Sequence, residues 1–502
     1  MWGTLALSAA TFMNVLDTSI ANVSLPAIAG DLGVSPNQGT WIITSFGVAN
    51  AIAVPLTGWL SQRFGQVRLF VTSVMLFVIT SWLCGLAPNM TTLIFFRVLQ
   101  GLVAGPLIPL SQSLLLSSYP KALAGVAMAL WSMTTLVAPV LGPLLGGWIT
   151  DNISWPWIFF INIPVGFGAA FVTWSIFHKR ESLTKKLPID SVGLTLLVLW
   201  VGALQIMLDK GQELDWFHSG EVVALGIVAF VGLIAFVIWE LTEEHPVVDL
   251  TLFKRRNFWA GALALSVGYG LFFGNVVLLP LWLQQYMGYT ATQAGMIMAP
   301  VGLLALLLSP VVGKSIGSVD PRRFSAFAFL VFALVLWMRS NFNVQADFTT
   351  ILIPTIVQGV AMAFFFIPLV TITLSGISPD RIPAASGLSN FVRITAGSFG
   401  TSIATTIWQD RAAMHHAQIS EYVNLGSTAT NNALSGLAGA GLTHEQALGT
   451  IDRMANQQAY MLAANDVFYV SALIFLALIP LVYLTRHSKA DAISADAAAG
   501  AH

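Results

Sequence analysis

The sequence predicts an all-α membrane protein, on the basis of composition, hydrophobic windows and the distribution of positive charge. Of the 502 residues, 56% are hydrophobic and only 9% are charged, whereas soluble globular chains carry about 25% charged residues. A helix that crosses a bilayer needs roughly 20 mostly apolar residues. Fourteen windows of this kind occur along the chain. We therefore expect lipid to surround most of the molecule.

Polar segments or clusters of glycine and proline separate the fourteen windows from one another. We predict one membrane-spanning helix in each of residues 3–27, 40–60, 69–87, 92–114, 123–149, 158–177, 191–208, 221–241, 258–283, 292–313, 324–340, 349–374, 384–407 and 466–485.

Lysine and arginine favour the cytoplasmic side of a membrane protein, which tests this arrangement. With the N-terminus in the cytoplasm, sixteen of the 22 Lys and Arg residues fall in cytoplasmic loops and four fall outside. The remaining two, Arg97 and Arg393, lie within predicted spans. The asymmetry predicts that both chain ends are cytoplasmic (N-in/C-in). The four outside residues are Lys210, Arg339, Arg411 and Arg453.

Two stretches of the chain repeat each other at an offset of 258 residues: TTLIFFRVLQG begins at Thr91 and TTILIPTIVQG begins at Thr349. Parallel repeats of six helices around a site at the membrane midplane are typical of secondary transporters. We expect two six-helix bundles with two helices inserted between them. The expected parts are a first bundle at 1–177, a linker with two extra helices at 178–257, a second bundle at 258–485 and a cytoplasmic tail at 486–502.

One long segment, residues 408–465, falls on the outside, in the periplasm if the membrane is a bacterial inner membrane. It is rich in alanine, glutamine and polar residues. We expect a solvated loop with one or two short helices. A docking surface for an extracytoplasmic partner is the alternative.

Three charged residues lie well inside predicted spans: Asp17, Arg97 and Arg393. Charges at this depth are costly and are functional candidates by default. Each has an amide residue three positions away, which puts the pair on one helix face. We expect these faces to line a central substrate cavity. The amides are Asn14, Gln100 and Asn390, and Gln358 repeats Gln100 in the second half.

Asp17 is the only carboxylate near the middle of a span. It is a candidate to carry a proton, to attract a cationic substrate, or to do both. The alternative is a structural ion pair with an arginine from another helix. At the repeat offset Arg97 corresponds to Thr355, so we expect the second half to lack a buried charge at that level. The amide residues are alternatively bridges between helices.

The fifth span contains APVLGPLLGGWI, residues 138–149. Small residues spaced by four let helices approach closely, and proline favours a bend. This pattern predicts a joint between two moving halves or, alternatively, close packing alone. The residues concerned are Ala138, Pro139, Gly142, Pro143, Gly146 and Gly147.

Several other classes of function find no support in the sequence. A net charge of −1 does not suggest a nucleic-acid partner, and a single cysteine, Cys84, cannot form an internal disulfide. The chain has no phosphate-binding G-x-x-x-x-G-K-[ST] loop. Its eight histidines lie outside the spans except His178 at an edge, and His415–His416 has no second ligand cluster. We therefore expect no enzyme activity, no metal and no cofactor.

The motifs together resemble the major facilitator superfamily, in particular its branch of fourteen-helix drug:proton antiporters. LDTSIANVSLPAI (16–28), FFRVLQG (95–101), APVLGPLLGG (138–147), WPWIFFINIPVG (155–166) and HPVVDLTLFKRRNF (245–258) are typical of that branch. The resemblance places Asp17 on the acidic position of the first-helix signature and Arg97 on an arginine that the family implicates in proton coupling. It also identifies GWLSQRFG as a cytoplasmic loop motif with Gly58, Arg63 and Gly65, in which Gln62 replaces the usual aspartate.

The resemblance implies a function and a location. It implies proton-driven export of small hydrophobic drugs by alternating access, from a multi-pass protein of the bacterial inner membrane. It also implies a tripartite system with a periplasmic membrane-fusion adaptor and a TolC-like outer-membrane channel. The alternative is an importer or exporter of an endogenous metabolite or lipid that works without an outer-membrane channel.

Overall fold

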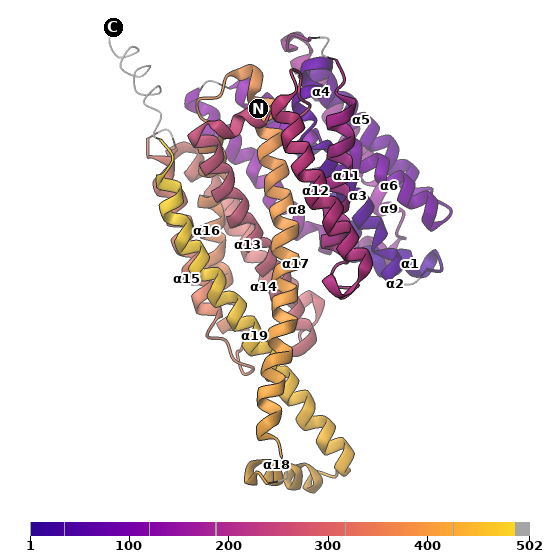
Figure 1. Ribbon diagram of the computed structural model, residues 1–502, viewed down its shortest axis with the longest axis vertical. Helices are drawn as coiled ribbons and strands as arrows, with labels where there is room; N and C mark the ends of the chain where they lie inside the picture. Colours follow the sequence, from indigo (N-terminus) through magenta and orange to yellow (C-terminus); the bar gives the residue numbers. More distant parts are fainter. Residues whose placement is uncertain are drawn as a thin grey trace.

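The computed structural model describes residues 2–34, 36–119, 121–185, 188–316, 318–424 and 426–486. All regular secondary structure in these ranges is helical. Most of the long helices run roughly along one direction and form a single bundle, from which α18 projects at one end (Figure 1). The predicted tail lies beyond Arg486, outside the described residues.

The first half of the bundle corresponds to the first six predicted spans. Three of its spans are interrupted: α3 and α4 meet at a bend of 62°, α6 and α7 are separated at Gly105–Pro106, and α9 and α10 are separated at Ile161. The elements are α1 (Trp2–Asp31), α2 (Pro36–Gly39), α3 (Trp41–Ala53), α4 (Thr57–Phe64), α5 (Gln66–Gly85), α6 (Met90–Ala104), α7 (Leu107–Ser118), α8 (Lys121–Asn152), α9 (Trp157–Phe160), α10 (Asn162–Phe177) and η1 (His178–Arg180).

The inserted pair and the second half follow. The pair is α11 (Ser191–Lys210) and α12 (Gly220–Thr242), with η2 (Trp216–His218) between them and η3 (Leu250–Lys254) after them. The second half comprises α13 (Arg256–Tyr286), α14 (Ala291–Ser315), α15 (Pro321–Arg339), α16 (Phe348–Leu374), η4 (Pro379–Arg381), α17 (Ile382–Tyr422), α18 (Thr428–Gly439) and α19 (His444–Tyr483).

Every predicted span coincides with one helix or one interrupted helix pair. Within the described residues, ten helices are long and apolar enough to cross a membrane, or eleven when the bent pair α3–α4 counts as one span. The start of α1 and the end of α19 lie at the same end of the bundle, opposite α18 (Figure 1). This arrangement is expected of a chain that crosses the membrane an even number of times, because both of its ends then lie on the same side of the membrane.

Side-chain caps mark where several helices begin. The carboxylate of Asp347 accepts a hydrogen bond from the backbone N–H of Thr350 at 2.9 Å and so caps α16. Hydrogen bonds from Thr350 hold the pKa of Asp347 below its ordinary value. Reciprocal capping boxes begin α14 at Thr290 and α19 at Thr443. The caps of α14 and α16 lie just before predicted apolar windows, whereas the cap of α19 lies about twenty residues before one.

The expectation of a loop over residues 408–465 is wrong for most of its length. α17 continues to Tyr422 and α19 begins at His444, so the segment is a helical hairpin closed by α18. It projects from the bundle (Figure 1). Polar residues that suggested a loop join the two helices: Asp466 binds both Arg411 at 2.6 Å and His415 at 2.8 Å.

Closely packed helix pairs organise each half. α1 packs on α8, and α13 packs on α17. In the second pair, a Cβ atom at Gly400 would lie 2.0 Å from the carbonyl oxygen of Gly270, so no larger residue fits without moving a backbone. Spans one and five of the first half and their repeats in the second half therefore pack in the same way.

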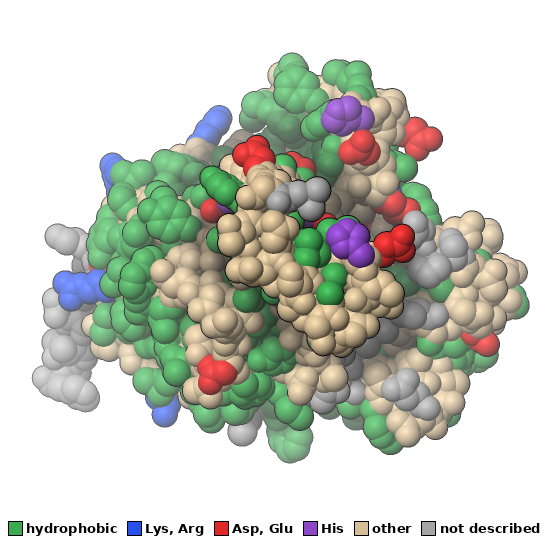
Figure 2. All heavy atoms as spheres, turned by 90° about the horizontal axis from the view of Figure 1, so that it is seen from below, with side chains coloured by type: hydrophobic (Ala, Val, Ile, Leu, Met, Phe, Trp, Pro, Cys, Tyr) green, Lys and Arg blue, Asp and Glu red, His purple; other side chains and the backbone are tan. Residues whose placement is uncertain are grey.

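The two halves meet through α8 on α14 and through α4 and α7 on α17. Gln112 of α7 accepts hydrogen bonds from Ser386 and, at 2.8 Å, from the amide of Asn390, both on α17. The inserted α11 packs on α3 of the first half and on α17 of the second. Figure 2 views the molecule from the α18 end, where acidic and histidine side chains are spread over the face and Lys and Arg appear only toward its edge.

We predict that Gly400→Ala destabilises the protein because its methyl group overlaps the backbone of α13. Overpacking of this kind costs about 1–3 kcal/mol, and thermal unfolding of the purified protein in detergent should show a lower Tm. Gly168→Ala is the matched control, since no atom lies within 4 Å of a Cβ atom there. Equal melting temperatures for the two variants would contradict the proposed tight contact.

Candidate functional site

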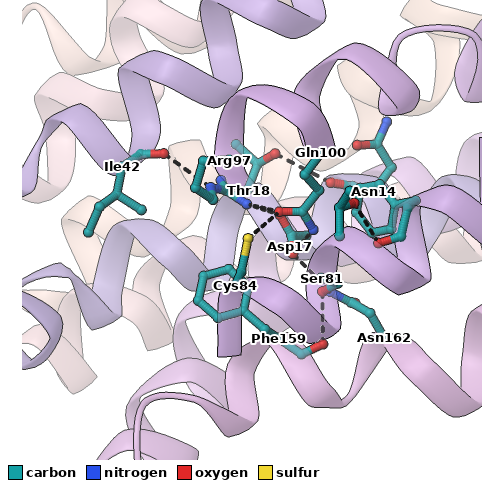
Figure 3. Close-up of polar contacts among 12 residues, drawn as sticks. Asn14, Asp17, Thr18, Ile42, Ser81, Cys84, Arg97, Gln100, Phe159 and Asn162 are labelled. Atoms are coloured by element: carbon teal, nitrogen blue, oxygen red, sulfur yellow. Dashed lines mark hydrogen bonds and ion pairs between the residues drawn. The ribbon is translucent and has the colours of Figure 1, made fainter. Parts of the chain in front are cut away.

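The carboxylate of Asp17 is enclosed by three hydrogen-bond donors from two other helices (Figure 3). Its Oδ2 accepts from Nη1 of Arg97 at 2.6 Å. Its Oδ1 accepts from Nε2 of Gln100 at 3.1 Å and from Nδ2 of Asn162 at 2.8 Å. The side chains of Asp17 and Arg97 are 1% and 0% exposed. These hydrogen bonds hold the buried carboxylate of α1 against α6 and α10.

Arg97 is itself held in place by several elements. Its Nε donates to the backbone carbonyl of Ile42 on α3 at 3.1 Å, and Nη1 also donates to Gln100 Oε1 at 2.7 Å. The guanidinium lies 4.3 Å from the ring centroid of Phe46 and 5.6 Å from that of Phe159. Nη2 is buried and has no hydrogen-bond partner among the described residues. The pair therefore joins α1, α3, α6 and the α9–α10 region.

Sequence reasoning missed the uncharged residues that support this pair, of which Asn162 binds Asp17 directly. Asn162 also donates to Ser81 Oγ at 3.0 Å, and Ser81 donates to the carbonyl of Phe159 at 2.9 Å. The Cys84 thiol donates to Gln100 Oε1 at 3.5 Å. The signal for Asn162 was its place in WPWIFFINIPVG, a motif typical of the antiporter branch. Asn14 is buried on α1, one turn before Asp17.

The second half also has a buried guanidinium at the level that corresponds to Arg97, which corrects the expectation that it lacks a buried charge there. Arg339, expected outside the membrane, is fully buried at the end of α15. Its Nη2 donates to Gln358 Oε1 at 2.6 Å and to Thr355 Oγ1 at 3.1 Å. Gln358 thus binds a guanidinium just as Gln100 does. The signal was available, because Thr355 and Gln358 occupy the repeat positions of Arg97 and Gln100.

The other predicted cavity residues form a third group, at the contact between the halves. Arg393 donates to Asn390 Oδ1 at 2.7 Å, and its guanidinium lies 4.5 Å from the ring centroid of Tyr269 and 4.9 Å from that of Phe366. Asn390 in turn donates to Gln112. The predicted cavity residues are therefore divided among three groups: the Asp17 site, the Arg339 site and the α7–α17 contact.

The small residues of the fifth span pack against the helix that carries Asp17. A Cβ atom at Gly142 would lie 2.3 Å from Ser19 Oγ, and one at Gly146 would lie 3.2 Å from the carbonyl of Ile20. Ala138 is fully buried, whereas a Cβ atom at Gly147 would meet nothing within 4 Å. The side chains of Pro139 and Pro143 lie outside the described part of the chain.

The cytoplasmic loop motif places α4 against the second half. A Cβ atom at Gly58 would lie 2.6 Å from Cβ of Ala384 on α17. The guanidinium of Arg63 lies 5.4 Å from the ring centroid of Trp59. Gly65 has a φ of 87°, which glycine adopts readily.

A carboxylate from elsewhere in the chain lies beside this motif. Glu181, which follows η1, accepts hydrogen bonds from the backbone N–H groups of Val67 at 3.0 Å and Arg68 at 2.9 Å. It therefore supplies negative charge at the N-terminus of α5. Gln62, which stands where the motif usually has an aspartate, lies four residues before the start of α5. Glu181 therefore places a carboxylate near the position where the motif's own is missing.

Comparisons with known proteins identify the family. The family model described as Major Facilitator Superfamily matches residues 7–401. The chain belongs to this superfamily. The human organic anion transporter MFSD10 (TETRAN) has the same fold, with a TM-score of 0.59 at 13% sequence identity over 95% of this chain and 99% of that one. The chain is thus a multi-pass membrane transporter, and family membership agrees with the expectation that it is not an enzyme.

Two curated relatives are much more similar in sequence. Multidrug export protein EmrB of Escherichia coli (strain K12) is 52% identical over 484 residues, covering 96% of this chain and 94% of that protein. Fatty acid resistance protein FarB of Neisseria gonorrhoeae is 50% identical over 485 residues, covering 97% and 96%. The resemblance to drug exporters of the superfamily, inferred from motifs, is confirmed.

We predict strong energetic coupling between Asp17 and Arg97. Asp17→Asn or Arg97→Gln alone should destabilise the protein by about 3–5 kcal/mol, because each leaves a buried charge without its partner. The double variant should lose much less than the sum. Unfolding of the purified protein by denaturant or heat provides the measurement.

The control is the same cycle on the partly exposed pair Arg411–Asp466. An exposed pair of this kind contributes about 0.2–1 kcal/mol, so Arg411→Gln and Asp466→Asn should be nearly additive. Additive losses at Asp17 and Arg97 would mean that the two side chains do not depend on each other.

Proposed function

We propose that this chain is a proton-coupled exporter of small hydrophobic toxic compounds in the bacterial inner membrane. The observation that carries the proposal is the Asp17–Arg97 pair, a titratable ion pair buried at the junction of four transmembrane segments. The similarity to EmrB, whose name describes a multidrug export protein, supports the direction of transport and the kind of substrate.

The proposal includes fourteen membrane crossings with both chain ends in the cytoplasm. Ten of the crossings are the helices that are long and apolar enough to span a membrane. The other four are the bent pair α3–α4 and the long helices α1, α8 and α17. Each of these coincides with a predicted span. The common end of the bundle at which α1 starts and α19 ends supports an even count (Figure 1). The hairpin of α17, α18 and α19 would then lie in the periplasm.

Proton coupling follows from what a proton on Asp17 would change. The ionised carboxylate holds Arg97, Gln100 and Asn162 together. A proton on Asp17 removes the charge that compensates Arg97 and one of the acceptor positions. The Arg97 guanidinium must then find another partner, and the contacts between α1, α6 and α10 weaken. Protonation is therefore coupled to helix positions in this half.

Transport by alternating access requires that this change reaches the contact between the halves. α8 is suited to transmit it, because Gly142 lies against Ser19 of α1, two residues from Asp17, while α8 also packs on α14 of the second half. A shift of α1 therefore moves α8 and, through it, α14. We propose Asn14, Gln100, Gln358, Asn390 and Arg393 as polar contacts for substrate along this path.

As partners we propose an EmrA-type membrane-fusion adaptor and a TolC-like outer-membrane channel. The projecting hairpin of α17, α18 and α19 supplies a surface outside the bundle for such an adaptor (Figure 1). The alternative remains an importer or exporter of an endogenous metabolite or lipid without an outer-membrane channel. The name of one relative, fatty acid resistance protein FarB, is the reason for keeping this alternative.

The first test is transport by purified protein in proteoliposomes with an imposed pH gradient. Uptake of a lipophilic drug into inverted vesicles should depend on the gradient in the wild type. We expect Asp17→Asn to abolish gradient-driven uptake and to retain drug binding, because the neutral amide cannot exchange a proton.

Glu221→Gln serves as the control for this experiment, since Glu221 is an exposed carboxylate in the first turn of α12. It should transport like the wild type. Full transport by Asp17→Asn would show that Asp17 is structural, and Asp466 and Glu240 would become the next candidates for the proton path.

The proposed topology can be tested by cysteine labelling in intact cells. The single native cysteine, Cys84, is fully buried, and should not react. We predict that a membrane-impermeant maleimide labels Glu421→Cys on the hairpin without permeabilisation, and labels Lys179→Cys only after permeabilisation. The reverse pattern would contradict the N-in/C-in orientation.

A further inference from the structure

A cavity of about 570 Å³ lies between the inserted helix pair and the second half of the bundle. α11, α12, the η3 segment and α17 form its walls, with Trp200, Phe236 and Phe391 among the largest side chains. Its volume falls in the range of about 300–1,000 Å³ that is usual for sites of small molecules. We call it the lateral cavity. None of the predicted coupling or substrate residues lines it.

The walls of the lateral cavity determine what could bind there. None of its twenty lining residues carries a charge, and Thr395 is the only one with a hydroxyl group. A charged molecule would lose its hydration without finding an opposite charge, at a cost of many kcal/mol. An uncharged, largely apolar molecule would lose little. The aromatic side chains of Trp200 and Phe391, in edge-to-face contact at 5.7 Å, offer flat apolar surfaces.

Two of the lining residues hold polar atoms without partners. Trp200 Nε1 and Thr395 Oγ1 are buried, and neither has a hydrogen-bond partner among the described residues. Buried polar atoms are nearly always hydrogen-bonded in folded proteins. A ligand with one carbonyl, ether or hydroxyl oxygen could satisfy either of them after a small rearrangement of the side chain.

The lateral cavity can be reached from the membrane. Its lining includes Phe230, which is 67% exposed on α12, and Leu233 and Phe399, which are also exposed. α12 is the least buried of the ten candidate spans, with 17% of its apolar window inside the protein. A molecule dissolved in lipid could therefore enter between α12 and α17 without crossing water.

We propose that the lateral cavity is a binding site for uncharged hydrophobic small molecules that enter from the membrane, distinct from the Asp17 site. Phe391 and Thr395 of α17 form one wall of this site. The same helix carries Arg393 between them in sequence and Asn390 directly before Phe391. Occupancy would thus be sensed by the helix that contacts Gln112 of the first half. The inference concerns binding and holds whether or not Asp17 couples transport to protons.

The test uses the full chain in phosphatidylcholine nanodiscs, without a pH gradient, and a neutral aryl-diazirine as photoreactive probe. Gly226→Trp should fill the cavity. A Cβ atom at Gly226 meets only Met207 Sδ at 3.4 Å and Phe217 Cε1 at 3.8 Å, which is ordinary contact. Ala224→Trp is the control, since Ala224 is exposed on the same helix and does not line the cavity.

We expect saturable labelling of the α11 and α17 segments that line the cavity, read by mass spectrometry. In Gly226→Trp the apparent affinity should fall by about tenfold or more, whereas Ala224→Trp should resemble the wild type. As a second variant that keeps the packing, Thr395→Val should weaken binding of a ketone-bearing probe such as benzophenone and spare the aryl-diazirine.

Three outcomes would overturn the proposal. Labelling that never saturates would mean that the probe reports bulk lipid. Labelling that is equal in Gly226→Trp and the wild type would place the probe elsewhere. The third outcome uses a phosphatidylcholine with a diazirine in its acyl chain: if this lipid labels the same residues and excess neutral probe does not displace it, the occupant is a lipid chain.

Discussion

A carboxylate and a guanidinium that face each other in the buried interior are the constraint on which the first half of this molecule depends. Each charge alone would be costly inside a membrane, so Asp17 and Arg97 have to meet. Their meeting fixes α1 against α6, while Ile42 and Asn162 fix α3 and α10 around the same point. The close contact of α8 with α1 adds a further long helix of this half.

The second half solves the same packing problem without an acid. Arg339 reaches the glutamine that repeats Gln100, but it comes from α15, and its Nε and Nη1 have no hydrogen-bond partner among the described residues. In both halves a buried guanidinium therefore donates to the glutamine at this repeat position, Gln100 or Gln358. Among the described residues, only the first half pairs this guanidinium with a carboxylate. The asymmetry of the repeat lies in the carboxylate and in the helix that supplies the arginine.

The sequence predicted the positions of the helices well because apolar windows follow directly from the cost of exposing polar groups to lipid. It also located Asp17 and Arg97, though only the fold shows that they pair. Arg339 was assigned to the outside because it ends an apolar window, and only packing decides whether such a residue points inward. Asn162 and Ser81 are uncharged, so nothing in the hydrophobic pattern singled them out. Asn162 does lie in a family motif, but Ser81 lies in none. The hairpin was predicted to be a loop because solvated loops and solvent-exposed helices have similar polar compositions.

The inserted helices have to take part in any rocking of the two halves, because they are tied to both. Lys210 at the end of α11 donates to Thr40 of the first half at 2.6 Å. Gln205 of α11 donates to Ser398 of α17 at 2.8 Å, and Ser402 donates to the carbonyl of Leu208 at 2.9 Å. If the halves rotate, one of these two sets of contacts must break. Since α11 and α17 both line the lateral cavity, a break on the α17 side also changes the shape of that cavity. Binding there and the orientation of the halves are then linked, and a ligand that fits one shape better favours the corresponding state.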